Sequence, residues 1–174
     1  MAGRFRRIST MRVFVNSCVI AALPIFVGCS SSDHAQSSRT LDDILTSVTA
    51  SQASTAPVPE SDVESLVKLS NSPDWRVSLS AFPMTESEYA SLPSQERERL
   101  LEQYLGEAGA LKGLAEAAMN EADEARLEGN DARAELIEMS VLRLAQANQG
   151  EDRLKLANLI GDSIVRQLVD SRTP

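Results

Sequence analysis

The apolar residues of the C-terminal half recur every three or four positions, and this period predicts long amphipathic helices. Between residues 94 and 128 the steps of three and four alternate, as in the seam of a coiled coil or a helical bundle. The seam consists of Leu101, Tyr104, Ala108, Leu111, Ala115, Ala118, Ala122 and Ala125. Because most of these positions carry alanine, we expect a neighbouring helix to pack unusually close.

The same stretch contains three glycines, Gly106, Gly109 and Gly113. Glycine costs about 1 kcal/mol relative to alanine in a helix interior. The glycines therefore either break the helix or let another backbone approach it. We expect a break or kink near Gly106.

Two polar, glycine-containing stops divide the rest of the chain into helices. Gly129-Asn130-Asp131 ends the first helix and offers Asn130 or Asp131 as the N-cap of the next. So short a connection predicts an antiparallel neighbour. Asn148-Gln149-Gly150 ends the second helix, and a third is expected to finish near Asp170. The inner faces are Ala134, Ile137, Val141, Leu144 and Ala147 or Asn148, then Leu154, Ala157, Ile160, Ile164 and Leu168. The predicted fold is mainly α, an antiparallel three- to four-helix bundle over residues 94–172.

Residues 61–93 give weaker signals, and we expect an entry segment of short helices. The capping-box spacing occurs twice, at Ser61 with Glu64 and at Thr85 with Glu88. Around residues 77–81, however, apolar and polar residues alternate as in a strand. Three aromatic residues lie in this segment: Trp75, Phe82 and Tyr89. They either form a ligand-binding patch or cover the end of the bundle.

A short amphipathic helix is predicted over residues 41–48, inside a tether of residues 29–60 that is otherwise rich in Ser, Thr, Ala and Pro. Thr40 and Asp43 have the spacing of a capping box. One stripe carries Leu41, Ile44, Leu45 and Val48. So short a helix is marginal alone. It docks either on its own domain or on another protein, so the stripe and Trp75 are candidate partner-binding residues.

The N-terminus has the pattern of an export signal. Four arginines precede an apolar run of 15 residues, Val13 to Val27, and this run is shorter than the roughly 20 residues of a transmembrane helix. The run ends in Phe26-Val27-Gly28-Cys29, which resembles the lipobox of bacterial lipoproteins, although Phe26 stands where leucine is usual. The resemblance implies a signal peptide of residues 1–28, cleavage between Gly28 and Cys29, and lipid on Cys29. An ordinary secretory signal with an incidental cysteine is the alternative.

The lipid would hold the protein on a membrane, since two or three acyl chains give stable anchoring. In lipoproteins an aspartate after the lipidated cysteine tends to retain the protein in the inner membrane, and Ser30 is not aspartate. We therefore expect a bacterial cell envelope protein. If the host has two membranes, we expect the outer membrane, with the domain facing the periplasm. Translation can start at Met1 or at Met11.

Composition excludes several kinds of chemistry. Four of the 17 basic residues precede Cys29, so 13 basic and 25 acidic residues remain, a net charge of −12. An acidic body of this kind argues against nucleic acid as a partner. Cys18 lies within the signal and His34 in the tether, so no disulfide, no Cys- or His-based metal site and no histidine-dependent catalysis is expected in the folded part. We expect no cofactor.

An acidic cluster crowds the end of the long predicted helix: Glu121, Asp123, Glu124, Glu128 and Asp131. We interpret it as a solvated face, with weak cation binding and acid–base catalysis as alternatives. For the whole protein the sequence favours a non-enzymatic adaptor or scaffold that binds an envelope protein. A self-assembling structural lipoprotein is the alternative from another class, followed by a small-ligand carrier or a Glu/Asp-dependent enzyme.

Overall fold

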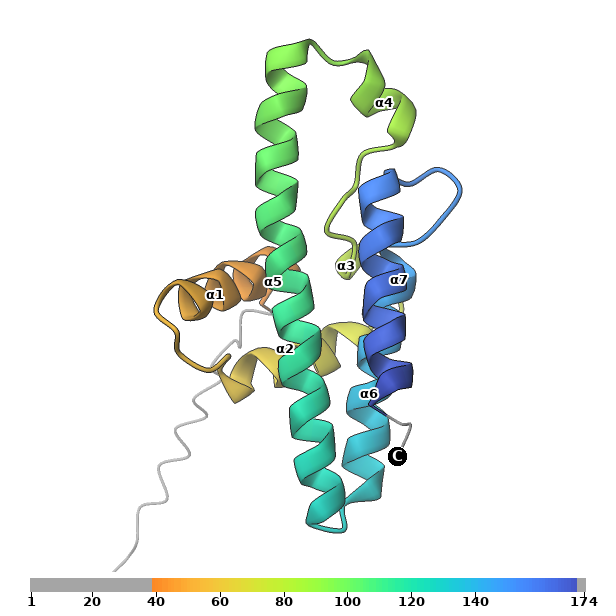
Figure 1. Cartoon of the computed structure of the whole chain (residues 1–174). Coiled ribbons are helices and arrows are strands. Elements are labelled where there is room, and N and C mark those ends of the chain that lie inside the picture. The colour runs from red at the N-terminus through yellow and green to blue at the C-terminus, as the bar shows by residue number, and fades with distance from the viewer. Residues whose placement is uncertain (1–38, 172–174) are drawn as a thin grey trace, which may run out of the picture. The chain divides into compact units, whose positions relative to one another are not determined.

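The computed structural model describes residues 39–171, so the predicted signal, its cleavage site at Gly28 and the lipid-attachment residue Cys29 lie outside the described part. Every regular element within it is a helix (Figure 1). The seven helices of these residues are α1 (Leu41–Ala53), α2 (Glu60–Ser70), α3 (Trp75–Ser78), α4 (Glu86–Ser91), α5 (Ser94–Leu127), α6 (Asp131–Ala147) and α7 (Lys155–Asp170). The predicted fold class, mainly α with antiparallel packed helices, is confirmed.

The bundle is built on α5, which α6 and α7 follow in antiparallel order, while α1 and α2 run across α5 (Figure 1). The predicted stop between α5 and α6 is confirmed in detail. Gly129 has φ of 77°, a conformation that favours glycine, and Asn130 caps α6 by accepting a hydrogen bond from the backbone N–H of Arg133. This tight turn directs α6 back along α5.

The alanine seam of α5 is buried, and the expected break at Gly106 is wrong. Helix α5 runs uninterrupted for 34 residues, a length of about 50 Å. A β-carbon built on Gly106 or Gly109 meets nothing within 4 Å, so neither glycine accommodates a neighbour. The buried seam residues Tyr104 and Ala108 flank Gly106 on either side. Their packing therefore offsets the glycine penalty, which is only about 1 kcal/mol per residue.

Helix α1 belongs to the folded domain, which corrects the boundaries predicted for the tether. It continues through Thr49 to Ala53, where a linker was expected. Its predicted capping box is present: Asp43 Oδ2 accepts from the Thr40 N–H at 2.9 Å and from the Thr40 hydroxyl at 2.8 Å. These two hydrogen bonds lower the pKa of the Asp43 carboxyl. At its far end the Gln52 side chain donates to the backbone oxygen of Gly109 at 3.2 Å, so α1 is tied to α5.

Residues 61–93 form short helices as predicted, with different starting points. Helix α2 begins two residues earlier than predicted, with Pro59 in place of Ser61 as its N-cap, and the predicted box at Ser61 does not form. The strand-like alternation around residues 77–81 produces a single helical turn, α3, instead. The box at Thr85 and Glu88 is present and starts α4. Among residues 39–171, no helix combines the length and apolarity required to cross a bilayer.

Asn148 fixes the connection between α3 and α4 to the bundle. Its side chain is buried, accepts from the Ala81 N–H at 3.0 Å and donates to the carbonyls of Leu79 at 3.0 Å and Leu144 at 2.9 Å. The adjoining Phe82 is fully buried and meets Tyr104 of α5 edge-on, with ring centroids 5.2 Å apart. This aromatic pair is thus core, in agreement with the expectation that such residues cover one end of the bundle.

Candidate functional site

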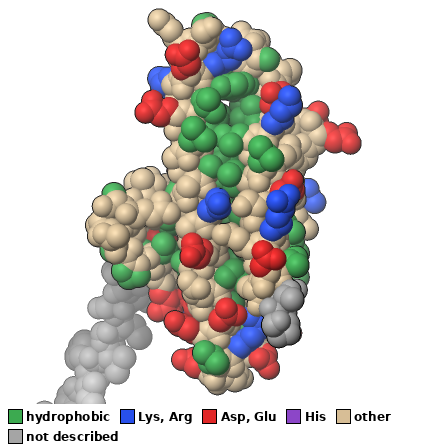
Figure 2. Space-filling model, viewed as in Figure 1, with side chains coloured by type: hydrophobic (Ala, Val, Ile, Leu, Met, Phe, Trp, Pro, Cys, Tyr) green, Lys and Arg blue, Asp and Glu red, His purple; other side chains and the backbone are tan. Residues whose placement is uncertain are grey.

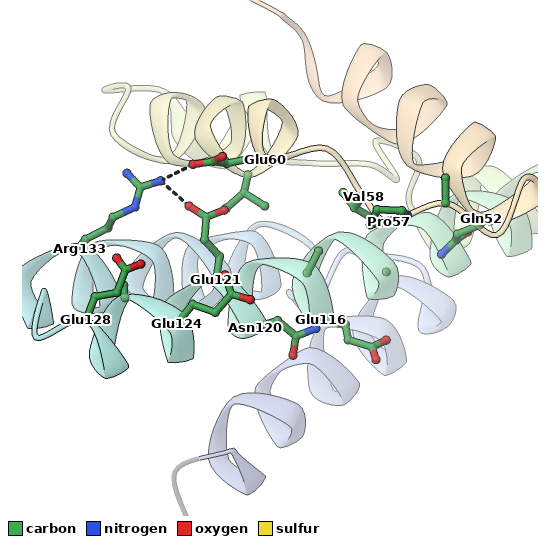
Figure 3. Close-up of a pocket in the computed structure, with 15 residues that line it drawn as sticks. Gln52, Pro57, Val58, Glu60, Glu116, Asn120, Glu121, Glu124, Glu128 and Arg133 are labelled. Atoms are coloured by element: carbon green, nitrogen blue, oxygen red, sulfur yellow. Dashed lines mark hydrogen bonds and ion pairs between the residues drawn. The ribbon is translucent and has the colours of Figure 1, made fainter.

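A groove of about 740 Å³ lies between the second half of α5 and the connection from α1 to α2 (Figure 3). We call it the acidic groove. It is lined by Gln52, Ala56, Pro57, Val58, Glu60, Val63, Gly113, Glu116, Ala117, Asn120, Glu121, Glu124, Ala125, Glu128 and Arg133. The sequence creates it at two points. Pro57 and Pro59 keep the connection from continuing α1 as a helix, and Gly113 leaves out a side chain that would collide with Gln52.

The groove combines apolar and charged lining. Its apolar part includes the buried residues Val63 and Ala125, with Val58 half-buried beside them. Its charged part holds five carboxylates and one guanidinium: Glu60, Glu116, Glu121, Glu124, Glu128 and Arg133. The lining therefore has an excess of negative charge beside apolar surface, an arrangement that suits a cationic and partly apolar ligand.

Arg133 of α6 occupies one end of the groove. Its Nη2 lies 3.5 Å from Oε1 of Glu60 and also pairs with Oε1 of Glu121, so that it bridges α2 and α5 (Figure 3). The Glu121 side chain is only 16% exposed. A guanidinium from the protein itself thus neutralises the enclosed Glu121 and also pairs with Glu60, whose side chain is 75% exposed.

Four other lining residues form a row along α5: Glu116, Asn120, Glu124 and Glu128. They are spaced by four residues, which places them on one helix face about 6 Å apart along the axis. All four are exposed. Within residues 39–171, the carboxylates of Glu116, Glu124 and Glu128 form no ion pair or hydrogen bond. We call these four residues the outer row.

The structure divides the predicted acidic cluster between two settings. Glu121, Glu124 and Glu128 line the groove, whereas Asp123 pairs with Arg126 of its own helix at 3.1 Å. Arg126 also pairs with the buried Glu138 of α6, and this contact raises the pKa of the guanidinium further. In the described part of the chain, no three Asp, Glu, His or Cys side chains are placed to hold a metal ion.

The candidate partner-binding stripe of α1 is used inside the domain. Leu41, Ile44, Leu45 and Val48 are each 4% exposed or less. Helix α1 packs mainly on α5 and secondarily on α2. The idea that this helix presents its apolar stripe to another protein is therefore corrected: it docks on its own domain, the other alternative that the pattern left open.

Trp75, the remaining candidate, lies at the junction of α2, α3 and α6. Its side chain is half-buried, and the guanidinium carbons of Arg76 and Arg143 lie 4.9 and 5.9 Å from its ring centre. Arg143 also donates to the backbone oxygen of Ser70 at 2.6 Å. Trp75 thus contributes to holding α2 and α3 on α6.

Outside the groove, Glu107 of α5 is a partly buried carboxyl with a shifted pKa. It is half-buried, and one of its oxygens is buried without a hydrogen-bond partner among the described residues. Burial raises the pKa of Glu107, and the charge of Asp42 raises it further, while a hydrogen bond from Gln103 at 2.8 Å acts in the opposite direction. The two side chains that act on it come from α1 (Asp42) and from its own helix α5 (Gln103).

Sequence reasoning missed the acidic groove, although one signal for it was visible. The spacing of the outer row shows that four polar residues share one face of α5. What the sequence did not show is the apolar wall opposite, since this wall belongs to residues 56–58, which were assigned to a tether. A scan against models of known protein families gave no match, and comparisons with curated proteins and with solved structures gave none either.

Proposed function

We propose that this chain is a lipid-anchored protein of a bacterial cell envelope that acts as a non-enzymatic adaptor. The observation that supports it best is the acidic groove: an open recess of about 740 Å³ with apolar lining and three exposed carboxylates that pair with no described residue. A surface of this kind suits contact with another protein. The lipobox-like Phe26-Val27-Gly28-Cys29 supports the anchor.

The length of chain after Cys29 bears on how this adaptor would work. Nine residues, Ser30 to Ser38, separate Cys29 from the first described residue, Arg39. Fully extended they span about 30 Å. Arg39, where the described domain begins, would therefore lie within about 30 Å of the membrane surface, and the adaptor would meet its partners near that membrane.

In-cell crosslinking of the tagged full chain, followed by mass spectrometry, tests the proposal. We expect one distinct envelope protein to be captured, and its yield to fall when Cys29→Ser prevents lipid attachment. Incorporation of labelled palmitate into the wild type but not into this variant checks the anchor directly. Capture of nothing but the chain itself would contradict the adaptor.

Self-assembly is the second candidate, and one observation favours it. Leu101 and Leu105 of α5 and Leu159 of α7 are 43%, 55% and 65% exposed. Figure 2 shows hydrophobic side chains gathered beside the first half of α5. The alanine seam is not available for such contacts, because α5 buries it within the domain. Light scattering of the full chain in detergent, compared with a Leu101→Ser/Leu105→Ser variant, should show dissociation of oligomers if these leucines hold them together.

A further inference from the structure

The acidic groove has the dimensions and charge to bind an extended peptide. From this we infer that its ligand is a segment of a partner protein in which basic residues alternate with apolar ones. The inference rests on the adaptor proposal and adds the chemistry of the partner.

The spacing of the outer row matches that of alternate side chains in an extended peptide. From Glu116 to Glu128 the row covers twelve residues of helix, which is about 18 Å, with a polar side chain every 6 Å. In an extended chain, alternate side chains on one face are about 6.7 Å apart. Four basic residues at alternate positions therefore span about 20 Å, and their flexible stems absorb the difference from the row.

The wall of the groove opposite the outer row is apolar. In an extended segment the side chains between the basic ones point the other way. On that side lie Pro57 and Val58 of the α1–α2 connection (Figure 3), and the lining also includes the buried Val63. Small or branched apolar side chains can gain contact there, so the two walls together favour alternation over a plain run of basic residues.

Arg133 shows that the groove already holds one cationic group of the protein itself. Its guanidinium pairs with Glu60 and Glu121 at one end, while Glu116, Glu124 and Glu128 pair with no described residue. The domain thus neutralises the enclosed Glu121 and the exposed Glu60 with its own arginine and leaves the carboxylates of the outer row for a ligand. Arg133 also repels a ligand cation at that end of the groove.

Binding of a synthetic peptide to the full chain in detergent tests the inference. The probe is a fluorescein-labelled heptapeptide, Lys-Ala-Lys-Val-Lys-Ala-Lys, and the readout is fluorescence anisotropy. A second peptide of the same composition with its four lysines grouped at one end is the control for spacing. We expect the alternating peptide to bind several-fold more tightly, and affinity to fall as salt screens the charges. Equal affinity of the two peptides, or no binding, would overturn the inference.

Three variants locate the site: a triple variant of the groove, a matched triple control and a single variant of Arg133. Exposed ion pairs are individually weak, so Glu116→Gln/Glu124→Gln/Glu128→Gln should raise the Kd about tenfold. The matched control, Glu96→Gln/Glu102→Gln/Glu135→Gln, removes the same charge from exposed positions outside the groove and should change the Kd less than about twofold. Arg133→Gln removes the competing cation and should lower the Kd severalfold. Equal loss in the two triple variants would mean general charge attraction and would overturn the groove as the site. Circular dichroism checks that each variant is folded.

Repeating the in-cell crosslinking with the same variants separates this inference from the adaptor proposal. If the groove variant loses the captured envelope protein and the control variant keeps it, the groove is the contact surface. If both capture the partner equally, the groove inference fails and the adaptor stands. If the wild type captures only itself, the adaptor fails, and with it the role assigned to the groove.

Discussion

The two ends of α5 are built from the same seam pattern and are buried very differently. Near the N-terminal end the seam residue Leu101 is 43% exposed, although leucine is large and apolar, and Leu105, which lies beside the seam, is 55% exposed. In the C-terminal part the seam alanines Ala115, Ala118 and Ala122 are fully buried. Large leucine side chains at the N-terminal end of α5 are thus exposed to solvent, while the alanine methyl groups of its C-terminal part are buried.

The neighbours of each end explain the difference. Helix α6 runs along the C-terminal part and α1 crosses the middle of α5 near Gly109 and Gly113, and these two helices have the most extensive packing on α5. Small side chains let those helices approach closely, so methyl groups suffice for burial. The N-terminal end is held by an irregular segment instead, through the edge-on pair of Phe82 with Tyr104 and a hydrogen bond of 3.1 Å from the Tyr89 hydroxyl to the Arg97 carbonyl. The periodicity of the sequence predicts which residues share a face of α5, but their burial depends on which other elements pack against that face.

Disrupting the packing of α1 on α5 should have the largest effect. Ile44 of α1 is 0% exposed, so Ile44→Asp buries an unpaired carboxylate and should cost more than about 4 kcal/mol of unfolding free energy. Urea unfolding followed by circular dichroism measures it in the full chain. Thr46→Asp, at an exposed position of the same helix, is the control and should change stability by less than about 0.5 kcal/mol. An unchanged urea midpoint for Ile44→Asp would mean that α1 does not cover α5.

Loosening the cover of the N-terminal end should have a smaller effect. Asn148→Ala leaves the N–H of Ala81 and the carbonyl of Leu79 without their partner, and buried orphan groups cost about 1–3 kcal/mol each. We expect a loss of about 2–4 kcal/mol by urea unfolding. The exposed Gln146→Ala on the same helix provides the baseline. Were Asn148→Ala as stable as that control, the segment would be held by its other contacts, the packing of Phe82 on Tyr104 and the hydrogen bond from Tyr89 to Arg97.

The glycines of α5 allow a substitution of the opposite sign. Gly106→Ala lies in a continuous helix with open space around the new methyl group, so it should stabilise the fold by about 0.5–1 kcal/mol. Gly113→Ala is the matched comparison, because its methyl group would displace the Gln52 side chain from its hydrogen bond to Gly109. We expect a smaller gain there, or none. Differential scanning calorimetry of both variants decides, and a loss of stability with Gly106→Ala would mean that the helix is strained at this point after all.

Much of the fold followed from local signals in the sequence. The capping boxes at Thr40 and Thr85, the turn at Gly129 and the ends of α6 and α7 are all determined by a few adjacent residues. Such features could be predicted because their hydrogen bonds form within one turn of the chain.

Features that depend on distant contacts could not be predicted. The last turn of helix α1 was assigned to a tether because residues 49–60 have the composition of a linker, yet Ser51 is buried and Gln52 bonds to a residue 57 positions away. The groove went unnoticed for the same reason, since one wall comes from this misassigned segment. Asn148 was expected to end a helix, which it does, but its contacts with Leu79 and Ala81 join elements almost 70 residues apart.

Between the two ends of α5, Glu107 should give the smallest effect and the one that depends on pH. Burial and the nearby Asp42 raise the pKa of its carboxyl above the ordinary value of 4.5. A raised pKa in the folded state means that this group favours folding most at a pH below 4.5, and that the contribution is lost as the pH rises through the folded-state value. Glu107→Gln should therefore be more stable than the wild type at pH 7, by about 0.5 kcal/mol or less because solvent screens a half-exposed group.

At pH 4 the stability difference between Glu107→Gln and the wild type should shrink, because the carboxyl of the wild type is then largely protonated. The carboxyls of Asp43 and Glu88 have lowered pKa values in the folded state, so their contribution is lost as the pH falls. This loss is common to both proteins and cancels in the difference. Thermal unfolding at pH 4 and pH 7, with the exposed Glu102→Gln as a reference, measures it. A difference that is equal at the two pH values would mean that the effect comes from the shape of the glutamine side chain. The ionised carboxyl of Glu107 would then cost no folding free energy at this position, where α5 passes from its exposed end to its buried one.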